Sequence, residues 1–129
     1  MDIVKQILLL KNIAVVGMSS RKERPSNYVS TYLNKNDYNI IPINPNYKII
    51  DGLTCYPNLE SVKTTIDTVT IFRKPEFVIP IVTSAISIKA KAIWMQDGVV
   101  NEKAKNIATA AGLMVKMNDC MLRQHRLME

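Results

Sequence analysis

Five short apolar runs, rich in β-branched residues, constrain the fold of this chain more than any other feature of its sequence. None of them alternates apolar with polar residues, as a strand with one face in water would. The segments between them are long enough for helices, a spacing typical of a parallel sheet buried on both faces. The sequence therefore predicts an α/β, doubly wound sheet of about five parallel strands flanked by helices. The expected strands are residues 13–16, 40–43, 69–72, 92–95 and 113–117.

Helix-capping residues mark several of the intervening segments. Pro80 is tolerated only in the first turn of a helix, so that helix is expected to start within residues 77–79. Asn101 is a good N-cap, and Gly112 suits the C′ position that ends the same helix. The expected helices are residues 27–36, 59–63, 78–88 and 102–111, with an amphipathic helix near the N-terminus (Ile3, Val4, Ile7 and Leu8 on one face) and a last short helix at residues 119–127.

Length and charge bound the organisation and disfavour several classes of partner. At 129 residues the chain is expected to form one domain, residues 1–129, with Trp94 and Met95 in its core. The net charge is +6, yet the cations are scattered, so a basic tail that binds nucleic acid is not indicated. No apolar stretch approaches the roughly 18 residues that a membrane span needs, and the N-terminus lacks the basic start of a secretory signal. We expect a cytoplasmic protein.

The cysteines and the single histidine do not suggest a metal site. Cys55 and Cys120 form no CxxC pair, and His125 is the only histidine. Structural zinc sites need several such ligands at close spacing, so no metal is expected. Two cysteines in a chain of this size are more often free thiols of an intracellular protein than a disulfide.

The first apolar run ends in a loop whose composition suits a phosphate group. A glycine breaks the run, two serines follow, and three cations lead into a predicted helix. A parallel strand that ends in this way brings a phosphate-bearing ligand to the backbone N–H groups at the start of the helix. The residues concerned are Gly17, Met18, Ser19, Ser20, Arg21, Lys22 and Arg24.

Polar and basic residues also follow the next strands. Since the carboxyl ends of parallel strands meet at one edge of the sheet, these segments are expected to converge there. Each phosphate of a polyphosphate ligand would gain charge-assisted hydrogen bonds at such an edge. The segments are Asn44-Pro45-Asn46-Tyr47-Lys48, Arg73-Lys74-Pro75 and Gln96-Asp97-Gly98.

The glycine loop differs from that of a typical NAD site. Such a site has the pattern G-x-G-x-x-G and an acid at the end of the second strand. This chain keeps only Gly17 of that pattern, and its second run ends in Asn44-Pro45. The pattern G-x-x-x-x-G-K-[ST] of a P-loop is absent as well. NAD is therefore disfavoured, whereas CoA and NADP, which carry an extra phosphate near the ribose, both stay open.

Several short segments, taken in order, resemble those of a known family. They are AVVGMSS from Ala14, ERPS from Glu23, PINPNY from Pro42, GLTCYPNL from Gly52, FRKPEFV from Phe72, WMQDGVVNE from Trp94, AGLMV from Ala111 and NDCMLRQH from Asn118. Nearly end to end, the chain resembles the small stand-alone CoA-binding proteins with a Rossmann-like fold, which are similar to the CoA-binding domain of the succinyl-CoA synthetase α subunit. It departs from the family pattern at Asp119, where a basic residue is common, and at Gln124, where an acid is common.

The resemblance implies that the chain binds coenzyme A, and it places candidate residues around that ligand. The first loop would hold the diphosphate, the second would frame the adenosine with its 3′-phosphate, and the third would close the other side. The candidate cofactor-binding residues are Gly17, Met18, Ser19, Ser20 and Arg24 in the first loop, Asn44, Pro45 and Lys48 in the second, and Phe72, Arg73 and Lys74 in the third.

The sequence supplies no nucleophile with its base and no general acid–base pair, so we expect a protein that binds coenzyme A or a short acyl-CoA without catalysis. Cys120 and His125 lie five residues apart on a short predicted helix and would face different ways. A milder hypothesis is that Cys120 forms a mixed disulfide with CoA. The alternatives are an NADP-binding, oxidoreductase-like protein and an interaction module that senses acyl-CoA, with a homodimer left open.

Overall fold

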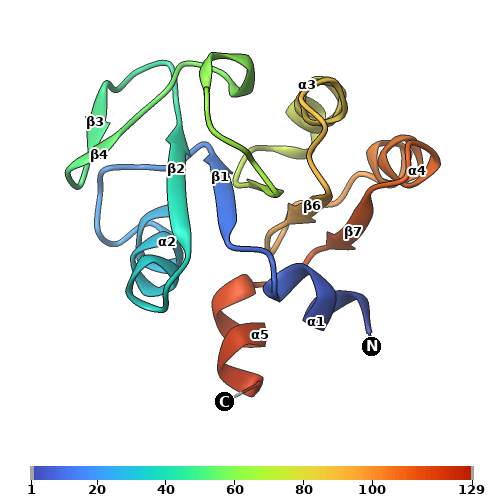
Figure 1. Cartoon of the computed structure of the whole chain (residues 1–129), viewed down its shortest axis with the longest axis horizontal. Coiled ribbons are helices and arrows are strands. Elements are labelled where there is room, and N and C mark those ends of the chain that lie inside the picture. Colours follow the sequence, from blue (N-terminus) through green and yellow to red (C-terminus); the bar gives the residue numbers. More distant parts are fainter. Residues whose placement is uncertain (1, 129) are drawn as a thin grey trace.

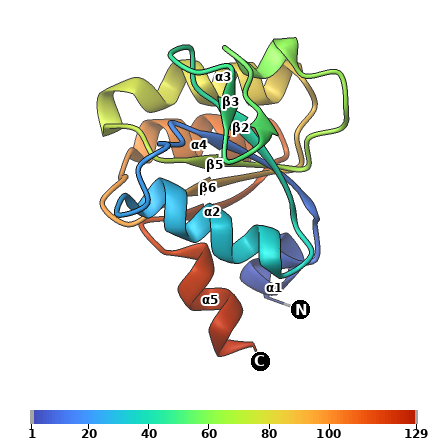
Figure 2. The same ribbon diagram turned by 90° about the vertical axis from the view of Figure 1, so that its left-hand side faces the viewer.

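A five-stranded parallel sheet with helices on both faces forms the centre of the computed structural model, which describes residues 2–128 (Figures 1 and 2). The strand order is β2-β1-β5-β6-β7, as in a doubly wound, Rossmann-like fold. The predicted sheet is confirmed, and each strand lies within one residue of its expected bounds. The strands are β1 (Asn12–Val16), β2 (Asn39–Ile43), β5 (Thr68–Ile71), β6 (Ala92–Met95) and β7 (Met114–Met117).

The helices divide between the two faces of the sheet. Helices α1 (Ile3–Leu8), α2 (Pro25–Lys35) and α5 (Met121–Leu127) cover one face. Helices α3 (Val78–Ser87) and α4 (Glu102–Ala110) cover the other (Figure 2). Two short 3₁₀ turns, η1 (Leu59–Ser61) and η2 (Pro75–Phe77), lie in the connections.

The helix predictions are confirmed for every element except the one expected at residues 59–63. Asn101 caps α4 through its side chain, Gly112 follows the helix at a φ of 91°, and Pro80 lies in the first turn of α3. The helix expected at residues 59–63 is only the 3₁₀ turn η1. The expected apolar face of the N-terminal helix is incomplete, because Ile3 remains 41% exposed.

Successive side chains of β1 enter two separate apolar cores. Ile13 and Val15 pack with α1, α2 and α5, whereas Ala14 and Val16 pack with α3 and α4. Because helices cover both faces, every one of these positions is buried, and the strand needs no polar alternation. Trp94 of β6 is fully buried in the first core, and Met95 in the second, as the sequence predicts.

A small hairpin, formed by β3 (Ile49–Ile50) and β4 (Leu53–Thr54), is absent from the sequence predictions. Its turn residues, Asp51 and Gly52, have φ angles of 50° and 78°. Positive φ at both central residues is the requirement of a type I′ turn, and Asp-Gly is a favoured pair for it. The hairpin matters for the site because it brings Asp51 beside the loop that follows β1.

The order of the strands reverses between β1 and β5. From β1 the chain moves to β2 on one side, and after the hairpin it crosses to β5 on the other side. The Gly17 N–H donates to the Ile43 carbonyl at 2.9 Å, and the Phe72 N–H donates to the Val16 carbonyl at 3.0 Å. The loop after β1 therefore starts at the crevice where sheets of this kind bind ligands.

Candidate functional site

Two adjoining hollows lie at the carboxyl edge of the sheet, and both are lined by Gly17 and Arg73. The β2-side hollow, about 480 Å³, extends from the end of β2 to η1 and α3. The α2-side hollow, about 650 Å³, extends from the start of α2 to the loop after β6 and to Cys120. An elongated ligand could therefore cross the strand-order reversal and occupy both hollows.

Gly17 is required by the close approach of two strands. Its φ is 87°, and a Cβ atom built on it would lie 2.7 Å from the Phe72 carbonyl oxygen. Only glycine, which has no Cβ atom, can adopt this φ where so little space is left. The glycine thus lets the loop after β1 pass directly over the end of β5, which joins the two hollows.

The loop after β1 is held against α2 by side chains of that helix. The Ser19 N–H donates to Ser26 Oγ at 2.9 Å, and Asn27 Nδ2 donates to the Ser19 carbonyl at 2.8 Å. Ser19 Oγ accepts from the Arg21 N–H at 3.0 Å. The hydroxyl of Ser19 therefore organises the loop.

The N-terminus of α2 has no side-chain cap. Arg24 occupies the N-cap position in an extended conformation and makes no capping hydrogen bond, and Pro25 follows at the first helical position. Within residues 2–128 the Ser26 N–H has no hydrogen-bond acceptor. Arg24, Pro25 and Ser26 all line the α2-side hollow. A helix start of this kind offers an N–H donor and a partial positive charge to an anion.

Asp51 of the hairpin holds the same loop from the other side. Its carboxylate accepts from Lys22 Nζ at 2.7 Å and from Asn27 Nδ2 at 2.9 Å. The hydrogen bond from Lys22, helped by that from Asn27 and opposed by partial burial, keeps the pKa of Asp51 below its ordinary value. Lys22, one of the loop cations, is therefore paired within the protein.

Some candidate residues support the loops, and several of these line neither hollow. Asn44 Nδ2 donates to the Met18 carbonyl at 3.0 Å, and Asn44 Oδ1 accepts from the Asn46 N–H at 2.9 Å. The Met18 side chain is 1% exposed and packs in the core, so only its main chain is available to a ligand. Ser20 and Lys48 line neither hollow, although Ser20 Oγ donates to the Tyr47 hydroxyl at 3.4 Å.

Three cations of the predicted set face the α2-side hollow. Arg24, Arg73 and Lys74 line it, and in the described part of the chain none of them forms an ion pair. The Arg73 guanidinium lies 4.6 Å from the ring centroid of Phe77. Phe72 and Gly17 line the same hollow, whereas Asn44 and Pro45 line the β2-side hollow. The structure therefore brings most of the candidate residues to one edge.

A C-terminal wall, formed by Gln96, Asp97 and Cys120, closes part of the α2-side hollow. The sequence places Gln96 and Asp97 at the sheet edge but does not single them out as binding residues. Arg123 donates to both carboxylate oxygens of Asp97, at 3.1 and 2.8 Å. The wall is thus fixed by a two-point ion pair between the β6 loop and α5.

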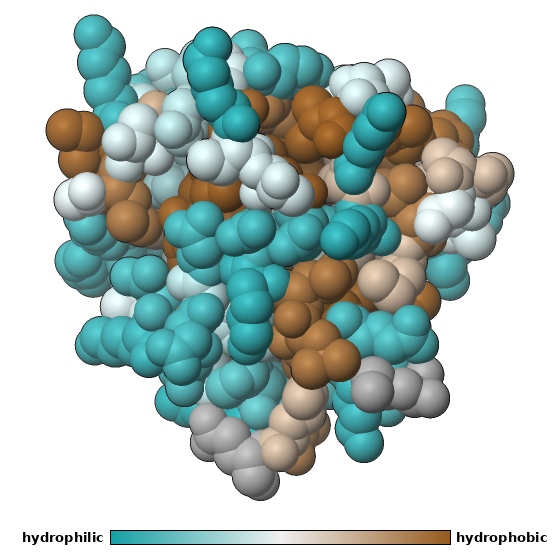
Figure 3. All heavy atoms as spheres, viewed as in Figure 1, coloured by the Kyte–Doolittle hydropathy of each residue, from teal (hydrophilic) through white to brown (hydrophobic). Residues whose placement is uncertain are grey.

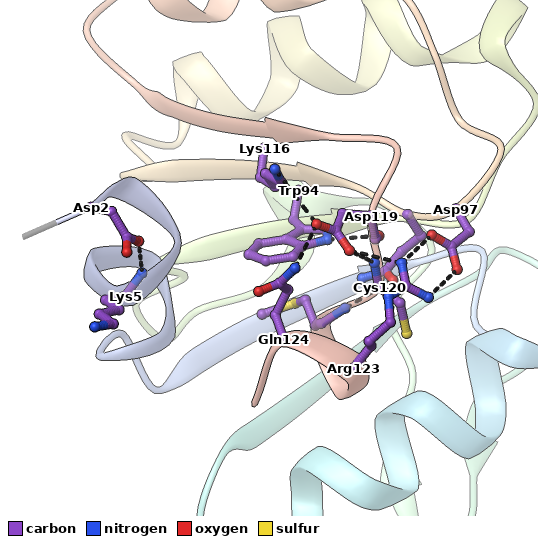
Figure 4. A network of polar contacts seen from close by, with 11 residues as sticks. Asp2, Lys5, Trp94, Asp97, Lys116, Asp119, Cys120, Arg123 and Gln124 are labelled. Carbon is purple, nitrogen blue, oxygen red and sulfur yellow. Dashed lines mark hydrogen bonds and ion pairs between the residues drawn. The ribbon is translucent and has the colours of Figure 1, made fainter. Parts of the chain in front are cut away.

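Asp119 joins the last strand to this wall (Figure 4). Burial opposes its ionisation, but hydrogen bonds from the Cys120 N–H, Arg123 and Gln124 outweigh that effect and keep the pKa of Asp119 below its ordinary value. Its main-chain carbonyl accepts from Trp94 Nε1 at 3.0 Å. Asp119 and Gln124, the two departures from the family pattern, therefore contact each other, at 2.9 Å.

His125 belongs to a different part of the molecule. Its Nδ1 lies 2.6 Å from the Tyr32 hydroxyl, and its ring also packs edge-on against Tyr38. It lines neither hollow. Among residues 2–128 no group of three or more His, Cys, Asp or Glu side chains could hold a metal ion.

Hydrophilic side chains cover much of the face seen in Figure 3, with hydrophobic residues between them. In the described part of the chain, no helix combines the length and the apolar character needed to cross a membrane.

The reversed strand order, the glycine loop and the two hollows at the carboxyl edge define a Rossmann-like ligand-binding domain. The family model of the CoA binding domain matches residues 11–126. The chain belongs to this CoA-binding domain family.

Known proteins of similar sequence or structure cover from four fifths to nearly the whole of the chain. The uncharacterized protein YneT of Bacillus subtilis (strain 168) is 34% identical over 123 residues, which are 95% of this chain and 91% of that protein. A hypothetical protein from Pyrococcus horikoshii OT3 has a TM-score of 0.94 at 37% identity, covering 99% of this chain and 91% of that one. A dinucleotide-forming acetyl-coenzyme A synthetase of Ca. Korarchaeum cryptofilum shares the fold, with a TM-score of 0.71 at 21% identity over 81% of this chain and 25% of that one.

Proposed function

We propose that this protein binds coenzyme A, or a short acyl-CoA, across the two hollows without catalysing a reaction. The observation that carries the proposal is the junction of the hollows at Gly17 and Arg73, beside the uncapped start of α2. CoA is an elongated ligand with a nucleotide at one end, phosphates in the middle and a thiol-bearing arm. Its diphosphate would lie at the junction, with one end of the ligand in each hollow.

Charge and hydrogen bonding at the junction suit the diphosphate. Arg24, Arg73 and Lys74 offer cationic donors, and the Ser26 N–H adds a main-chain donor at the positive end of a helix. In the β2-side hollow, whose lining is mixed polar and apolar, Pro45 and Ile81 supply apolar surface suited to the adenine base. Lys48, at the end of the loop after β2, would reach the 3′-phosphate from the rim.

The surroundings of the titratable groups support binding without catalysis. Asp97, a carboxylate of the α2-side hollow, is paired with Arg123, and His125 packs against Tyr32 and Tyr38. Neither group is positioned to move a proton on the ligand. Both cysteines are free thiols, which is consistent with a cytoplasmic protein.

A thermal-unfolding panel with CoA, acetyl-CoA, NAD, NADP and ATP tests the ligand. A ligand at 100 times its Kd stabilises the native state by about 2.7 kcal/mol, so CoA and acetyl-CoA should raise the Tm by several degrees. Selective stabilisation by NADP would support an oxidoreductase-like protein instead. No shift with any nucleotide would contradict the proposal and favour an interaction module.

The non-catalytic part is tested by incubating the protein with acetyl-CoA and following the thioester by mass spectrometry. We expect the acetyl-CoA to remain intact, and hydrolysis above the rate in buffer would contradict this part alone. Size-exclusion chromatography with and without CoA tests the homodimer, which remains a prediction.

A further inference from the structure

The C-terminal wall of the α2-side hollow contains a buried amide whose N–H₂ group has no partner among the described residues. Gln96 lines the hollow and is 2% exposed. Its Oε1 accepts from the Met121 N–H at 3.4 Å, but its Nε2 has no hydrogen-bond partner within the described residues. A buried N–H₂ group without an acceptor is unfavourable, so a ligand carbonyl that reached it from the hollow would stabilise it.

A free thiol lies in the same wall. Cys120 is half-buried and lines the hollow together with Gln96, whereas Cys55 is buried in the core. The Cys55 thiol donates to the Asn44 carbonyl at 3.4 Å, and burial raises its pKa, opposed by that hydrogen bond. Thiol exchange requires an accessible thiolate. The two cysteines therefore differ in whether a ligand can reach them.

The charges next to Cys120 are already balanced. Asp119 accepts from the Cys120 N–H at 2.7 Å, and the same carboxylate is paired with Arg123 at 2.8 Å and Lys116 at 3.5 Å (Figure 4). The side chain of Asp97 is paired with Arg123 as well. An approaching anionic ligand therefore meets no unpaired carboxylate at this wall among the described residues.

We propose that this wall is a subsite for the thiol-bearing arm of the ligand, in which Cys120 exchanges with the disulfide of CoA. The inference rests on the proposed function, because the arm reaches the wall only if the nucleotide binds at the junction. Gln96 Nε2 donates to an amide carbonyl of the arm. The Cys120 thiolate attacks one sulfur of the CoA disulfide, the S–S bond breaks, and a Cys120–CoA disulfide forms while one CoA leaves as a thiolate that takes up a proton.

The exchange is tested with the intact protein and its two cysteine variants. Wild type, Cys120→Ser and Cys55→Ser are incubated with CoA disulfide or with glutathione disulfide, and adducts are located by peptide mass spectrometry. We expect one CoA on Cys120 in wild type and in Cys55→Ser, formed at least tenfold faster than the glutathione adduct and slowed by added acetyl-CoA. Cys120→Ser should form no adduct. Equal rates with the two disulfides, or an adduct only on Cys55, would overturn the proposal.

Calorimetry of CoA binding under reducing conditions separates this inference from the proposed function. Binding without an adduct at Cys120 would overturn the exchange and leave the proposed function standing. Absence of binding would overturn the proposed function itself, and with it the subsite.

The role of Gln96 is tested with a ligand that lacks the arm. Gln96→Leu should weaken CoA binding about tenfold while leaving the affinity for 3′-phosphoadenosine 5′-diphosphate unchanged, because only CoA supplies the amide carbonyl. An equal loss for both ligands would overturn the subsite. Thermal unfolding of the variant checks that it is folded, and its unchanged binding of the arm-free nucleotide provides a second check.

Discussion

Helices α2 and α4 begin at the same edge of the sheet, but only α4 has a side-chain cap at its N-terminus. In α4, Asn101 Oδ1 accepts from the Ala104 N–H at 2.9 Å, and Asn101 Nδ2 donates to the Pro75 carbonyl at 2.9 Å. In α2, Arg24 occupies the N-cap position without a capping bond. Both helices follow a parallel strand, α4 after β6 and α2 after β1. Both starts therefore lie at the carboxyl edge, although the helices cover opposite faces of the sheet, and the local chemistry differs.

The difference separates a helix start that stabilises the fold from one that is available to a ligand. The first turn of a helix has N–H groups that its own backbone cannot satisfy, and a capping side chain satisfies one of them. Asn101 does this for α4. In α2 the Ser26 N–H has no acceptor in residues 2–128, and the helix start faces the larger hollow. An anion bound at this point would accept the hydrogen bond that a capping side chain would otherwise accept.

The largest effect is expected for Gly17→Ala. The added Cβ would lie 2.7 Å from the Phe72 carbonyl oxygen at a φ of 87°, so the junction of the hollows must distort. We expect loss of CoA binding and about 2–4 kcal/mol of destabilisation, measured by calorimetry and urea unfolding. Gly112→Ala is the matched control, because its φ is 91° but nothing lies within 4 Å. If both variants lose equal stability, the close approach at Gly17 is not the cause.

A smaller effect is expected for Arg24→Ser, which should raise the stability of the protein but weaken its binding of CoA. Serine would cap α2 and remove a cation from the hollow, so the protein should gain about 0.5–1 kcal/mol while CoA binds about tenfold more weakly. Urea unfolding and calorimetry measure the two quantities. Arg21→Ser is the comparison: Arg21 lines the same hollow but is paired with Glu23 at 2.8 Å, so its loss should weaken CoA binding less than loss of Arg24, which has no ion pair within residues 2–128. Unchanged CoA affinity in Arg24→Ser would remove the α2 start from the site.

The converse effect is expected for Asn101→Ala. Loss of the α4 cap should cost about 1 kcal/mol of stability, while CoA affinity stays the same. Urea unfolding and calorimetry on the same sample give both values. Weaker CoA binding with unchanged stability would mean that α4, not α2, presents the ligand-binding helix start.

The smallest effect is expected for the pH dependence of stability that comes from Asp51, which holds the β3–β4 hairpin to the loop after β1. The pKa of Asp51 is lowered on folding, so its carboxylate stabilises the native state fully above the ordinary value near 3.8, and this is lost as the pH falls through the folded value. Asp51→Asn should therefore lose less stability than wild type between pH 7 and pH 3, by less than about 1 kcal/mol because the site is near the surface. Urea unfolding at both pH values measures the difference. Identical pH dependence in both proteins would show that Asp51 is not a tether.

The sheet could be predicted from the sequence because strands that are buried on both faces appear as continuous apolar runs. Ile13 and Val15 enter one core, and Ala14 and Val16 the other, so the whole run is apolar. The β3–β4 hairpin has two-residue strands and gives no periodic pattern, so only Asp51-Gly52 could have indicated it.

The candidate site was predictable in its loops but not in the direction of its side chains. Gly17, Arg24 and Arg73 follow the strands whose carboxyl ends converge, so the topology places them. Met18 turns into the core instead of the hollow, and no local pattern fixes that. The partnerless Nε2 of Gln96 depends on contacts with α5, far along the chain, which one sequence cannot supply.

The central claim is that the start of α2, and not that of α4, meets the phosphates of the ligand. A titration of ¹⁵N-labelled protein with CoA, followed by amide NMR, tests it directly. We predict large shifts for the amides of residues 17–20 and for that of Ser26, and unchanged positions for residues 102–104. Shifts at residues 102–104 with none at Ser26 would contradict the claim.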